Sequence, residues 1–278
     1  MRLAISNIAW DVVEDENIAA LLKRYGVDAI DVAPGKYFPD PVAATSRQIA
    51  DVRDAWTARG IDITGMQALL FGTQGLNLFG CAASQASMLQ HLNEVCRIGS
   101  GLGATRLVFG SPKNRDRKGL DDWEAQDIAV PFFRALGAIA EDHGVTFCLE
   151  PNPECYGANF MTTSPVTAQI VRKVDHPSIL MQLDTGSLTI NGEDPYSVLK
   201  DDADLIGHIH ASERDLLPLG DGDTDHVAMA AAINRHLPDL LVSIEMLPTR
   251  NESHLDTIER ALNVAIQHYR NQPPSTQP

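Results

Sequence analysis

The stretch Val145-Thr146-Phe147-Cys148-Leu149-Glu150 is the first of four similar segments in the second half of the chain. Each segment is an apolar run that ends in a side chain able to bind a metal ion. The other three are Ile179-Leu180-Met181-Gln182-Leu183-Asp184, Leu205-Ile206-Gly207-His208-Ile209-His210 and Leu241-Val242-Ser243-Ile244-Glu245. Runs of this length, separated by helix-compatible segments, are typical of parallel strands that are buried on both faces.

The rest of the chain continues the alternation of strand and helix. Apolar runs predict four more strands, at residues 3–9, 29–33, 61–70 and 105–109. Helical spacing predicts helices at 15–25, 41–59, 84–102 and 121–143, and then near 163–174, 195–200, 227–236 and 252–269. Eight such units predict an α/β fold, the (β/α)8 TIM barrel, which typically needs about 250 residues. No Gly-rich dinucleotide fingerprint follows the first strand, which argues against an open doubly wound sheet.

One domain accounts for the chain. We assign residues 1–270 to the barrel and the polar, proline-rich residues 271–278 to a disordered tail. The 22 Lys and Arg against 37 Asp and Glu give a net charge of −15, which argues against nucleic acid or an anionic membrane as a partner. The 4 cysteines form no CxxC pair, and neither a signal peptide nor a membrane-spanning run is evident. We therefore expect a cytoplasmic protein with free thiols.

The ends of the four quoted segments predict a metal site. In a barrel of parallel strands the last residues of all strands meet at one mouth, where barrel enzymes keep their chemistry. Glu150, Asp184, His210 and Glu245 would then surround one point, as ligands of a divalent cation with open positions for a substrate. Taken singly, each is better explained as an ordinary strand-end group that faces water. Four consecutive strands with such ends favour the metal site.

The layer beneath these ligands is also unusual for a barrel core. Because side chains alternate along a strand, the residues two positions earlier point the same way, one layer deeper. On two of the strands these are Gln182 and His208, where a purely structural barrel favours branched apolar residues. We predict that both support the ligands from below. For His208 alone, the alternative is a core histidine with its hydrogen bonds satisfied.

Two of the predicted ligands can also move protons. A divalent ion that binds sugar oxygens polarises a carbonyl and stabilises the enediolate left when a neighbouring C–H proton is removed. One carboxylate can take that proton, and a second can return a proton to the neighbouring carbon or to the other face of the same carbon. Glu150 and Glu245 are the candidates, with Asp184 and His210 mainly as structural ligands.

Four motifs together resemble the xylose-isomerase-like barrel superfamily of sugar isomerases and epimerases. They are Cys148-Leu149-Glu150-Pro151-Asn152-Pro153, Leu183-Asp184-Thr185-Gly186, His208-Ile209-His210 followed by Ser212-Glu213, and Ser243-Ile244-Glu245. The resemblance to its ketose 3-epimerases implies acid/base roles for Glu150 and Glu245, and Mn²⁺, Co²⁺ or Mg²⁺ as the cofactor. It also implies a homo-oligomer, because barrels of this family often pair.

The chain departs from those epimerases at two positions that contact substrate in them. They usually have a histidine three residues after the metal aspartate, where this chain has Ser187, and a glutamate where it has Tyr156. Several other side chains follow strands at the same mouth. We therefore assign substrate contacts to Lys36, Gln67, Lys113, Asn114, Asn152, Tyr156 and Arg214. For Arg115, Arg117 and Lys118 a solvated loop charge is at least as good an explanation.

An apolar wall over the sugar is a further expectation. Trp10, Met66, Phe71 and Phe109 lie near strand mouths, although core packing or loop anchoring explains them equally well. The sequence thus predicts a divalent-metal-dependent sugar epimerase or isomerase that acts on a small-molecule carbohydrate through a cis-enediolate. The alternatives are a metal-dependent lyase or dehydratase on a keto-sugar or polyol, a non-catalytic sugar-binding barrel, and an abasic-site endonuclease.

Overall fold

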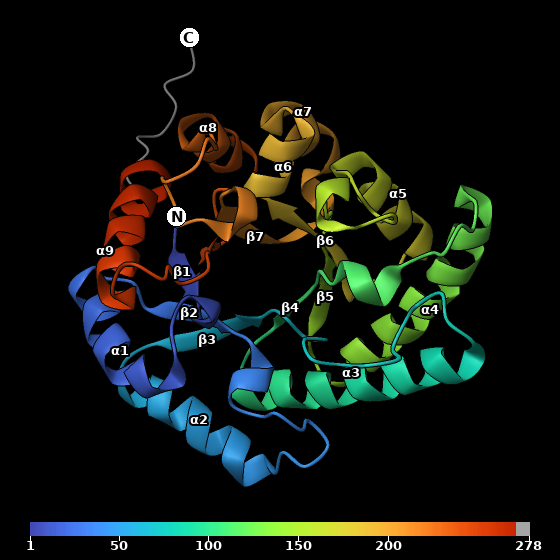
Figure 1. Ribbon diagram of the computed structural model, residues 1–278, viewed down its shortest axis with the longest axis horizontal. Coiled ribbons are helices and arrows are strands. Elements are labelled where there is room, and N and C mark those ends of the chain that lie inside the picture. The colour runs from blue at the N-terminus through green and yellow to red at the C-terminus, as the bar shows by residue number, and fades with distance from the viewer. Residues whose placement is uncertain (271–278) are drawn as a thin grey trace.

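The computed structural model describes residues 1–270, in which eight parallel strands close into a barrel (Figure 1). Each strand pairs with its two neighbours in chain order, and β8 pairs with β1. The strands are β1 Leu3–Ser6, β2 Ala29–Val32, β3 Asp62–Met66, β4 Arg106–Phe109, β5 Thr146–Leu149, β6 Ile179–Asp184, β7 Ile206–Ser212 and β8 Val242–Glu245. The predicted single-domain (β/α)8 fold is confirmed. The predicted tail at 271–278 lies outside the described residues.

Helices surround the barrel in the order that the sequence predicts (Figure 1). They are α1 Asp15–Arg24, α2 Ser46–Ala58, α3 Ala82–Leu102, α4 Asp122–Asp142, α5 Ser164–Val174, α6 Thr185–Asn191, α7 Pro195–Asp202, α8 His226–His236 and α9 His254–Ala265, and a π-helical turn, η8 Ile266–Arg270, follows α9. Side chains from strands and helices interlock between the two layers. Phe109 of β4, for example, meets Phe133 of α4 edge to face, with ring centroids 5.4 Å apart.

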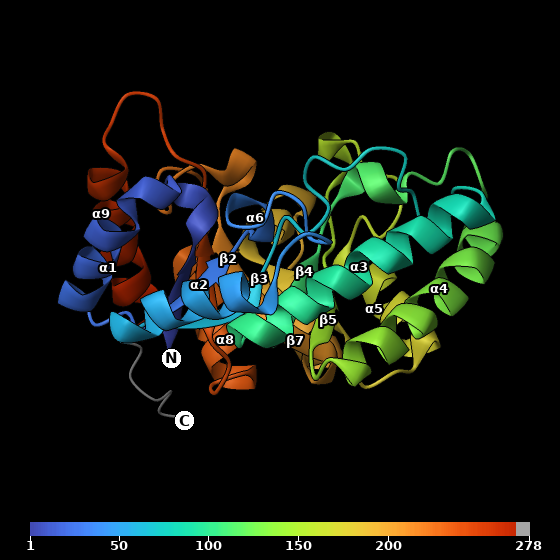
Figure 2. The same ribbon diagram turned by 90° about the horizontal axis from the view of Figure 1, so that it is seen from below.

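The strands run toward the face that carries the functional loops. In the side view of Figure 2 the N-terminus lies at the lower edge, and the loop from β8 to α9 rises at the upper edge. Cross-strand register brings Asp184 of β6 opposite His210 of β7, and Ser212 of β7 opposite Glu245 of β8. No helix among residues 1–270 is both long enough and apolar enough to cross a membrane.

Local chemistry moves two of the predicted boundaries and adds one helix. The helix predicted from residue 41 begins at Ser46, because Thr45 and Gln48 form a reciprocal capping box that fixes the N-terminus there. The strand predicted to reach residue 70 ends at Met66, because Ala68 takes a left-handed conformation with φ of 54°. The short helix α6, which was not predicted, starts because Asp184 caps it by accepting a hydrogen bond from the Ser187 backbone N–H at 2.6 Å.

A buried glutamate holds the loop between β7 and α8. Glu213 is 2% exposed and accepts hydrogen bonds from the backbone N–H groups of Gly220 and Thr224 at 2.9 and 3.0 Å. His226 Nε2 lies 2.9 Å from the same carboxylate. Gly222 passes so close that a Cβ atom there would lie 2.3 Å from Glu213 Oε2. Burial raises the pKa of Glu213, but these contacts outweigh it and lower that pKa to about 2.

We predict that Glu213→Gln lowers the free energy of unfolding at pH 7 by about 2 kcal/mol, because a charge-assisted buried network is lost. The ordinary pKa of 4.5 falls to about 2 on folding. The carboxylate therefore stabilises the fold above about pH 4.5 and loses that contribution as the pH falls toward 2. Urea denaturation between pH 7 and pH 2.5 measures this, with the exposed Glu16→Gln as the control. Equal pH dependence in wild type and Glu213→Gln would contradict the assignment.

Candidate metal-binding and acid/base site

Four side chains from consecutive strands meet at the mouth of the barrel. Glu150 follows β5, Asp184 ends β6, His210 lies in β7 and Glu245 ends β8. Each offers one ligand atom, and the four atoms all lie within 4.8 Å of one another. The structure therefore brings together the four residues that the sequence predicts as one set.

The set is largely buried, and its histidine faces the carboxylates without an aligned hydrogen bond to them. His210 is 0% exposed and Asp184 6%. The Nδ1 atom of His210 lies 3.1 Å from Glu245 Oε2 and 3.8 Å from Glu150 Oε1, yet neither of its ring nitrogens has an aligned hydrogen-bond partner within residues 1–270. A buried nitrogen that faces carboxylate oxygens without bonding to them suits a shared cation. Three carboxylates and one imidazole match the donors of hard or borderline divalent ions.

Like charges at such distances shift the titration of the site. Burial and the neighbouring charges of Glu245 and Asp184 raise the pKa of Glu150 to about 8. Burial also raises the pKa of Asp184, with Glu245 as the main neighbouring charge. Burial alone would lower the pKa of His210, but the carboxylates around it raise that pKa to about 10. The protein thus favours added positive charge at this point, which a divalent cation would also supply.

Hydrogen-bond donors orient the three carboxylates. Gln67 Nε2 donates to Glu245 Oε1 at 2.6 Å, and Asn152 Nδ2 donates to Glu150 Oε2 at 2.9 Å. The hydroxyl of Ser212 donates to Asp184 Oδ2 at 2.8 Å, while the backbone of α6 binds the other oxygen. Ser212 was not predicted as a site residue, although it lies two positions after His210 and so points to the same side of β7.

The layer below the four residues contains a second buried pair. His208 donates from Nε2 to Asp31 Oδ2 at 2.9 Å, and the same oxygen lies 3.9 Å from His210 Nε2. Burial would raise the pKa of Asp31, but the two histidines lower it to about 2. Gln182 is buried, and its amide has no hydrogen-bond partner among residues 1–270. His208 thus reaches the site through Asp31, which was missed although it interrupts the apolar strand Ala29–Val32.

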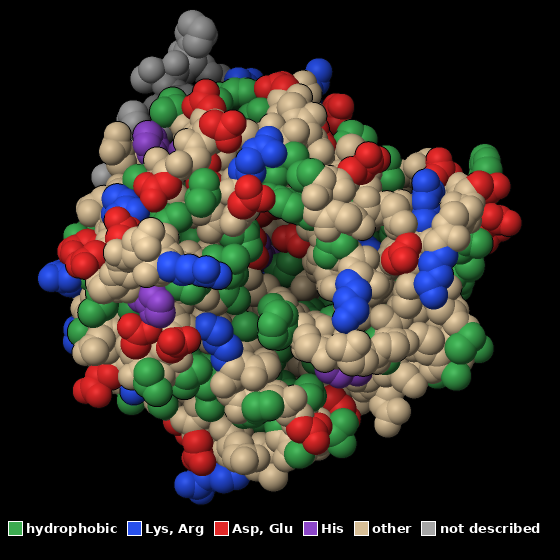
Figure 3. All heavy atoms as spheres, viewed as in Figure 1, with side chains coloured by type: hydrophobic (Ala, Val, Ile, Leu, Met, Phe, Trp, Pro, Cys, Tyr) green, Lys and Arg blue, Asp and Glu red, His purple; other side chains and the backbone are tan. Residues whose placement is uncertain are grey.

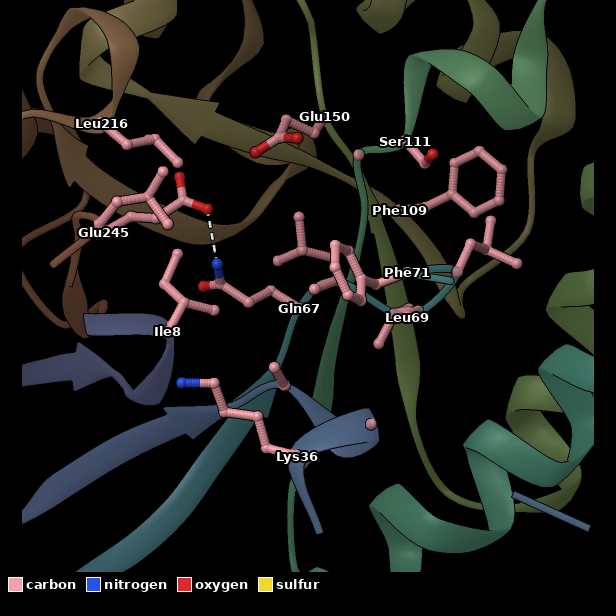
Figure 4. A pocket seen from close by; sticks show the side chains of 17 residues that line it. Ile8, Lys36, Gln67, Leu69, Phe71, Phe109, Ser111, Glu150, Leu216 and Glu245 are labelled. Atoms are coloured by element: carbon pink, nitrogen blue, oxygen red, sulfur yellow. Dashed lines mark hydrogen bonds between the residues drawn. The ribbon is translucent and has the colours of Figure 1, made fainter. Parts of the chain in front are cut away.

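A cavity of about 480 Å³ opens beside the carboxylates, and Figure 3 shows its mouth as a hollow near the centre of this face. Glu150 and Glu245 line it, together with Gln67 and Lys36 (Figure 4). The amine of Lys36 donates to the backbone oxygens of Asn7 and Trp10 at 2.8 and 2.5 Å. Of the predicted wall residues, Phe71 lines the cavity. Phe109 borders it at the end of β4 but packs its ring on Phe133, and Trp10 and Met66 belong to the core.

The other residues that we assigned to substrate lie outside this lining. Lys113 donates to the Thr73 oxygen at 3.2 Å, and the buried Asn114 donates to the Leu76 oxygen at 2.7 Å. Tyr156 accepts a hydrogen bond from the Asp215 backbone at 2.7 Å, and Arg214 is exposed. Asn152 reaches the site through Glu150. Their contacts with a substrate stay predictions.

A buried arginine stands behind Glu150. Arg115, in the 3-10 turn η4 Pro112–Arg115, is 0% exposed and donates from Nη1 to the Glu150 backbone oxygen at 2.8 Å. Burial lowers the pKa of Arg115 to about 10, against the attraction of Glu150. The explanation of Arg115 as a solvated loop charge is therefore wrong. Its run of charged neighbours in the sequence gave no signal of burial.

Comparison with known proteins identifies a matching family model, a curated relative and several solved structures with a similar fold. Residues 19–268 match the family model described as the xylose isomerase-like TIM barrel. A D-psicose 3-epimerase of Ruminiclostridium cellulolyticum is 30% identical over 101 residues, which are 36% of this chain and only 32% of that relative.

Two solved structures illustrate the range of that fold. A D-psicose 3-epimerase of Clostridium cellulolyticum, crystallised with D-tagatose, is 18% identical, with a TM-score of 0.80 over 97% of this chain and 98% of that one. A probable 3-DHS dehydratase of Bacillus anthracis is 16% identical, with a TM-score of 0.70 over 95% and 98%. At these identities the structures show a shared fold.

We predict that Gly110→Ala weakens Mn²⁺ binding by roughly 10–100-fold, the range typical when the orientation of a metal ligand is lost. A Cβ atom at Gly110 would lie 1.8 Å from Glu150 Oε2, so the carboxylate must turn away. Folding should survive, because a side-chain end moves rather than backbone. Gly35→Ala is the matched control, since Gly35 also lines the cavity and a Cβ there meets nothing within 4 Å. Titration calorimetry decides: equal Mn²⁺ affinities in the two variants would contradict a ligand role for Glu150.

Proposed function

Because the chain belongs to the xylose isomerase-like TIM barrel family, we propose that it is a divalent-metal-dependent sugar epimerase or isomerase. The observation that supports this most is the pair Glu150 and Glu245, two carboxylates that line one cavity and share one histidine between them. Similarity to ketose 3-epimerases in fold, and in part of the sequence, agrees with the proposal.

Glu150, Asp184, His210 and Glu245 would hold the ion. Their mixed oxygen and nitrogen donors fit Mn²⁺, Co²⁺ or Mg²⁺, and the unpaired nitrogen of His210 faces the carboxylates that would share it. When bound, a divalent ion supplies Lewis acidity that polarises a substrate carbonyl and stabilises an enediolate. Gln67, Asn152 and Ser212 would keep the carboxylates oriented whether or not substrate is present.

The two glutamates would carry the protons. One carboxylate removes the proton from the carbon next to the carbonyl, and the C–H electron pair forms the cis-enediolate. The other returns a proton to the opposite face of that carbon, which gives the epimer, or to the former carbonyl carbon, which gives the isomer. Each glutamate has one oxygen fixed by a side-chain amide, and that oxygen keeps a lone pair for proton transfer.

The main alternative shares the first step. In a lyase or dehydratase the same proton abstraction is followed by loss of a hydroxyl group as water, and a probable dehydratase is among the proteins with this fold. An abasic-site endonuclease fits less well, because the net charge is −15 and the site has one histidine with three carboxylates. A non-catalytic sugar-binding barrel would bind metal and sugar without proton exchange.

The choice of metal, the cytoplasmic location and the homo-oligomer stay predictions. The 4 free cysteines, of which Cys96 and Cys148 are buried, agree with a reducing compartment.

We predict that the Mn²⁺-loaded protein exchanges deuterium from D2O into a ketose and that Glu245→Gln abolishes this exchange. Glutamine keeps the size of the side chain but cannot accept the proton. NMR of a panel of ketoses measures the result: deuterium at C3 with a new epimer indicates an epimerase, deuterium at C1 or C2 with an aldose indicates an isomerase, and loss of water indicates a lyase.

The control for that experiment is Glu154→Gln, which changes an exposed glutamate outside the cavity lining. It should exchange like the wild type. Thermal melting and Mn²⁺ titration must show that Glu245→Gln is folded and metal-bound. Wild-type exchange in Glu245→Gln would remove its acid/base role, and no exchange in any ketose, free or substituted with a hydrocarbon group, by the metal-loaded wild type would remove the proposed function.

A further inference from the structure

The cavity beside the two glutamates is mostly apolar. Only five of its seventeen lining residues have polar side chains: Lys36, Gln67, Ser111, Glu150 and Glu245. Large apolar side chains form much of the remaining wall, which we call the apolar wall and define by five residues: Ile8, Leu69, Phe71, Leu216 and Leu247. Figure 4 shows Leu216 and Ile8 on either side of Glu245, and Phe71 on the other side of Gln67.

Most polar groups of the lining already have partners within the protein, although the amide oxygen of Gln67 has none among residues 1–270. Gln67 donates to Glu245, and the hydroxyl of Ser111 donates to Asn114 at 2.6 Å. Lys36, the one cation among the described residues that line the cavity, donates to two backbone oxygens. Burial of a hydroxyl group without a hydrogen bond is strongly unfavourable. The wall therefore disfavours both the outer hydroxyl groups of a free sugar and a phosphate group.

Strained backbone places one leucine on the wall. Leu216 has φ of 53° and follows Asp215 at 57°, in the left-handed region that non-glycine residues rarely adopt. The conformation is held from both sides: the Leu247 N–H donates to the Leu216 oxygen at 2.8 Å, and the Asp215 N–H donates to Tyr156 at 2.7 Å. Strain of this kind costs of order 1–3 kcal/mol and is most common at functional sites.

The apolar character continues to the rim. Phe71 is 89% exposed and Leu247 is 45% exposed, although both line the cavity. Exposed apolar side chains that are grouped together mark a binding surface, whereas exposed apolar side chains that are scattered singly are normal and need no explanation. The volume of about 480 Å³ lies within the range of roughly 300–1,000 Å³ that holds drug-sized ligands, which are larger than a monosaccharide.

From these observations we propose that the substrate is a keto-sugar or keto-polyol that carries an aromatic or aliphatic hydrocarbon group. This inference rests on the proposed function and names its substrate class. The carbonyl-bearing end reaches Glu150 and Glu245, and the hydrocarbon group packs against Leu216, Phe71 and the rest of the apolar wall. Free ketoses and sugar phosphates are poor substrates, because the apolar side chains of the wall offer their outer groups no hydrogen bonds and Lys36 is already bound to two backbone oxygens.

The test compares D-fructose with its 1-O-benzyl and 6-O-benzyl ethers and with its 6-phosphate. Titration calorimetry on the Mn²⁺-loaded protein measures affinity, and deuterium exchange measures kcat/KM. We expect at least one benzyl ether to exceed D-fructose at least tenfold in affinity and in kcat/KM, since burial of one ring provides roughly 1.5–3 kcal/mol. The phosphate should bind no better than D-fructose.

Leu216→Asn tests the wall directly. Asparagine has nearly the size of leucine and tolerates the left-handed backbone, so the variant adds polarity with little strain. We expect it to reduce the preference for the benzyl ether to near unity. Leu217→Asn is the matched control, because Leu217 is 43% exposed next along the chain but does not line the cavity. It should keep the wild-type preference.

The outcomes separate this inference from the proposed function. Exchange with D-fructose and the benzyl ethers at equal kcat/KM, or an equal loss of preference in both leucine variants, overturns the substrate class and leaves the function. Tighter benzyl-ether binding that Leu216→Asn removes, without exchange, keeps the apolar subsite and overturns the function. Sedimentation tests whether a second copy of the chain covers the wall instead. If Leu216→Asn or Phe71→Asn converts a dimer into monomers and leaves the ligand preference intact, a second copy covers the wall and the inference is wrong.

Discussion

Electrostatic repulsion among three buried carboxylates is the constraint on which the rest of this site depends. Their ligand atoms lie within 4.8 Å of one another and of His210, and burial excludes much of the water that would screen them. The neutral donors Gln67, Asn152 and Ser212 fix the carboxylates but cannot neutralise them. Arg115 helps from behind, through the Glu150 backbone. A divalent cation at the centre would remove the remaining repulsion, so the site is arranged for a charge that the protein itself does not provide.

The fold and the meeting of the four side chains followed from the sequence because both depend on local patterns. Apolar runs of strand length that alternate with helices allow few topologies, and a parallel barrel brings all strand ends to one mouth. Once Glu150, Asp184, His210 and Glu245 were recognised as strand ends, their proximity needed no further information. The errors at element boundaries have the same local origin: a capping box at Thr45 and a left-handed Ala68 decide where helix and strand stop.

The residues that were missed depend on contacts between distant parts of the chain. Asp31 meets His208 across 177 positions, and Arg115 meets Glu150 across 35. In the sequence Arg115 is one charge in a basic loop, and nothing in its neighbours distinguishes a buried guanidinium from a solvated one. The hydrogen bond that the Tyr156 hydroxyl accepts from the Asp215 backbone is likewise a contact between distant segments that the sequence did not predict. Loop backbone conformation, which periodicity does not encode, decides which side chains reach the substrate.

The apolar wall and the acid/base pair are held by the same two loops, so they cannot change independently. After β3, Gln67 orients Glu245, and the left-handed Ala68 next to it turns the chain so that Leu69 and Phe71 reach the cavity. After β8, Leu247 lies two residues beyond Glu245 and holds Leu216 through its backbone N–H. A movement that opened the wall to a bulkier group would therefore also displace Glu245, the carboxylate to which we assign a proton transfer. Because the same loops hold the wall and Glu245, the fit of the proposed hydrocarbon group would influence how well Glu245 is positioned for proton transfer.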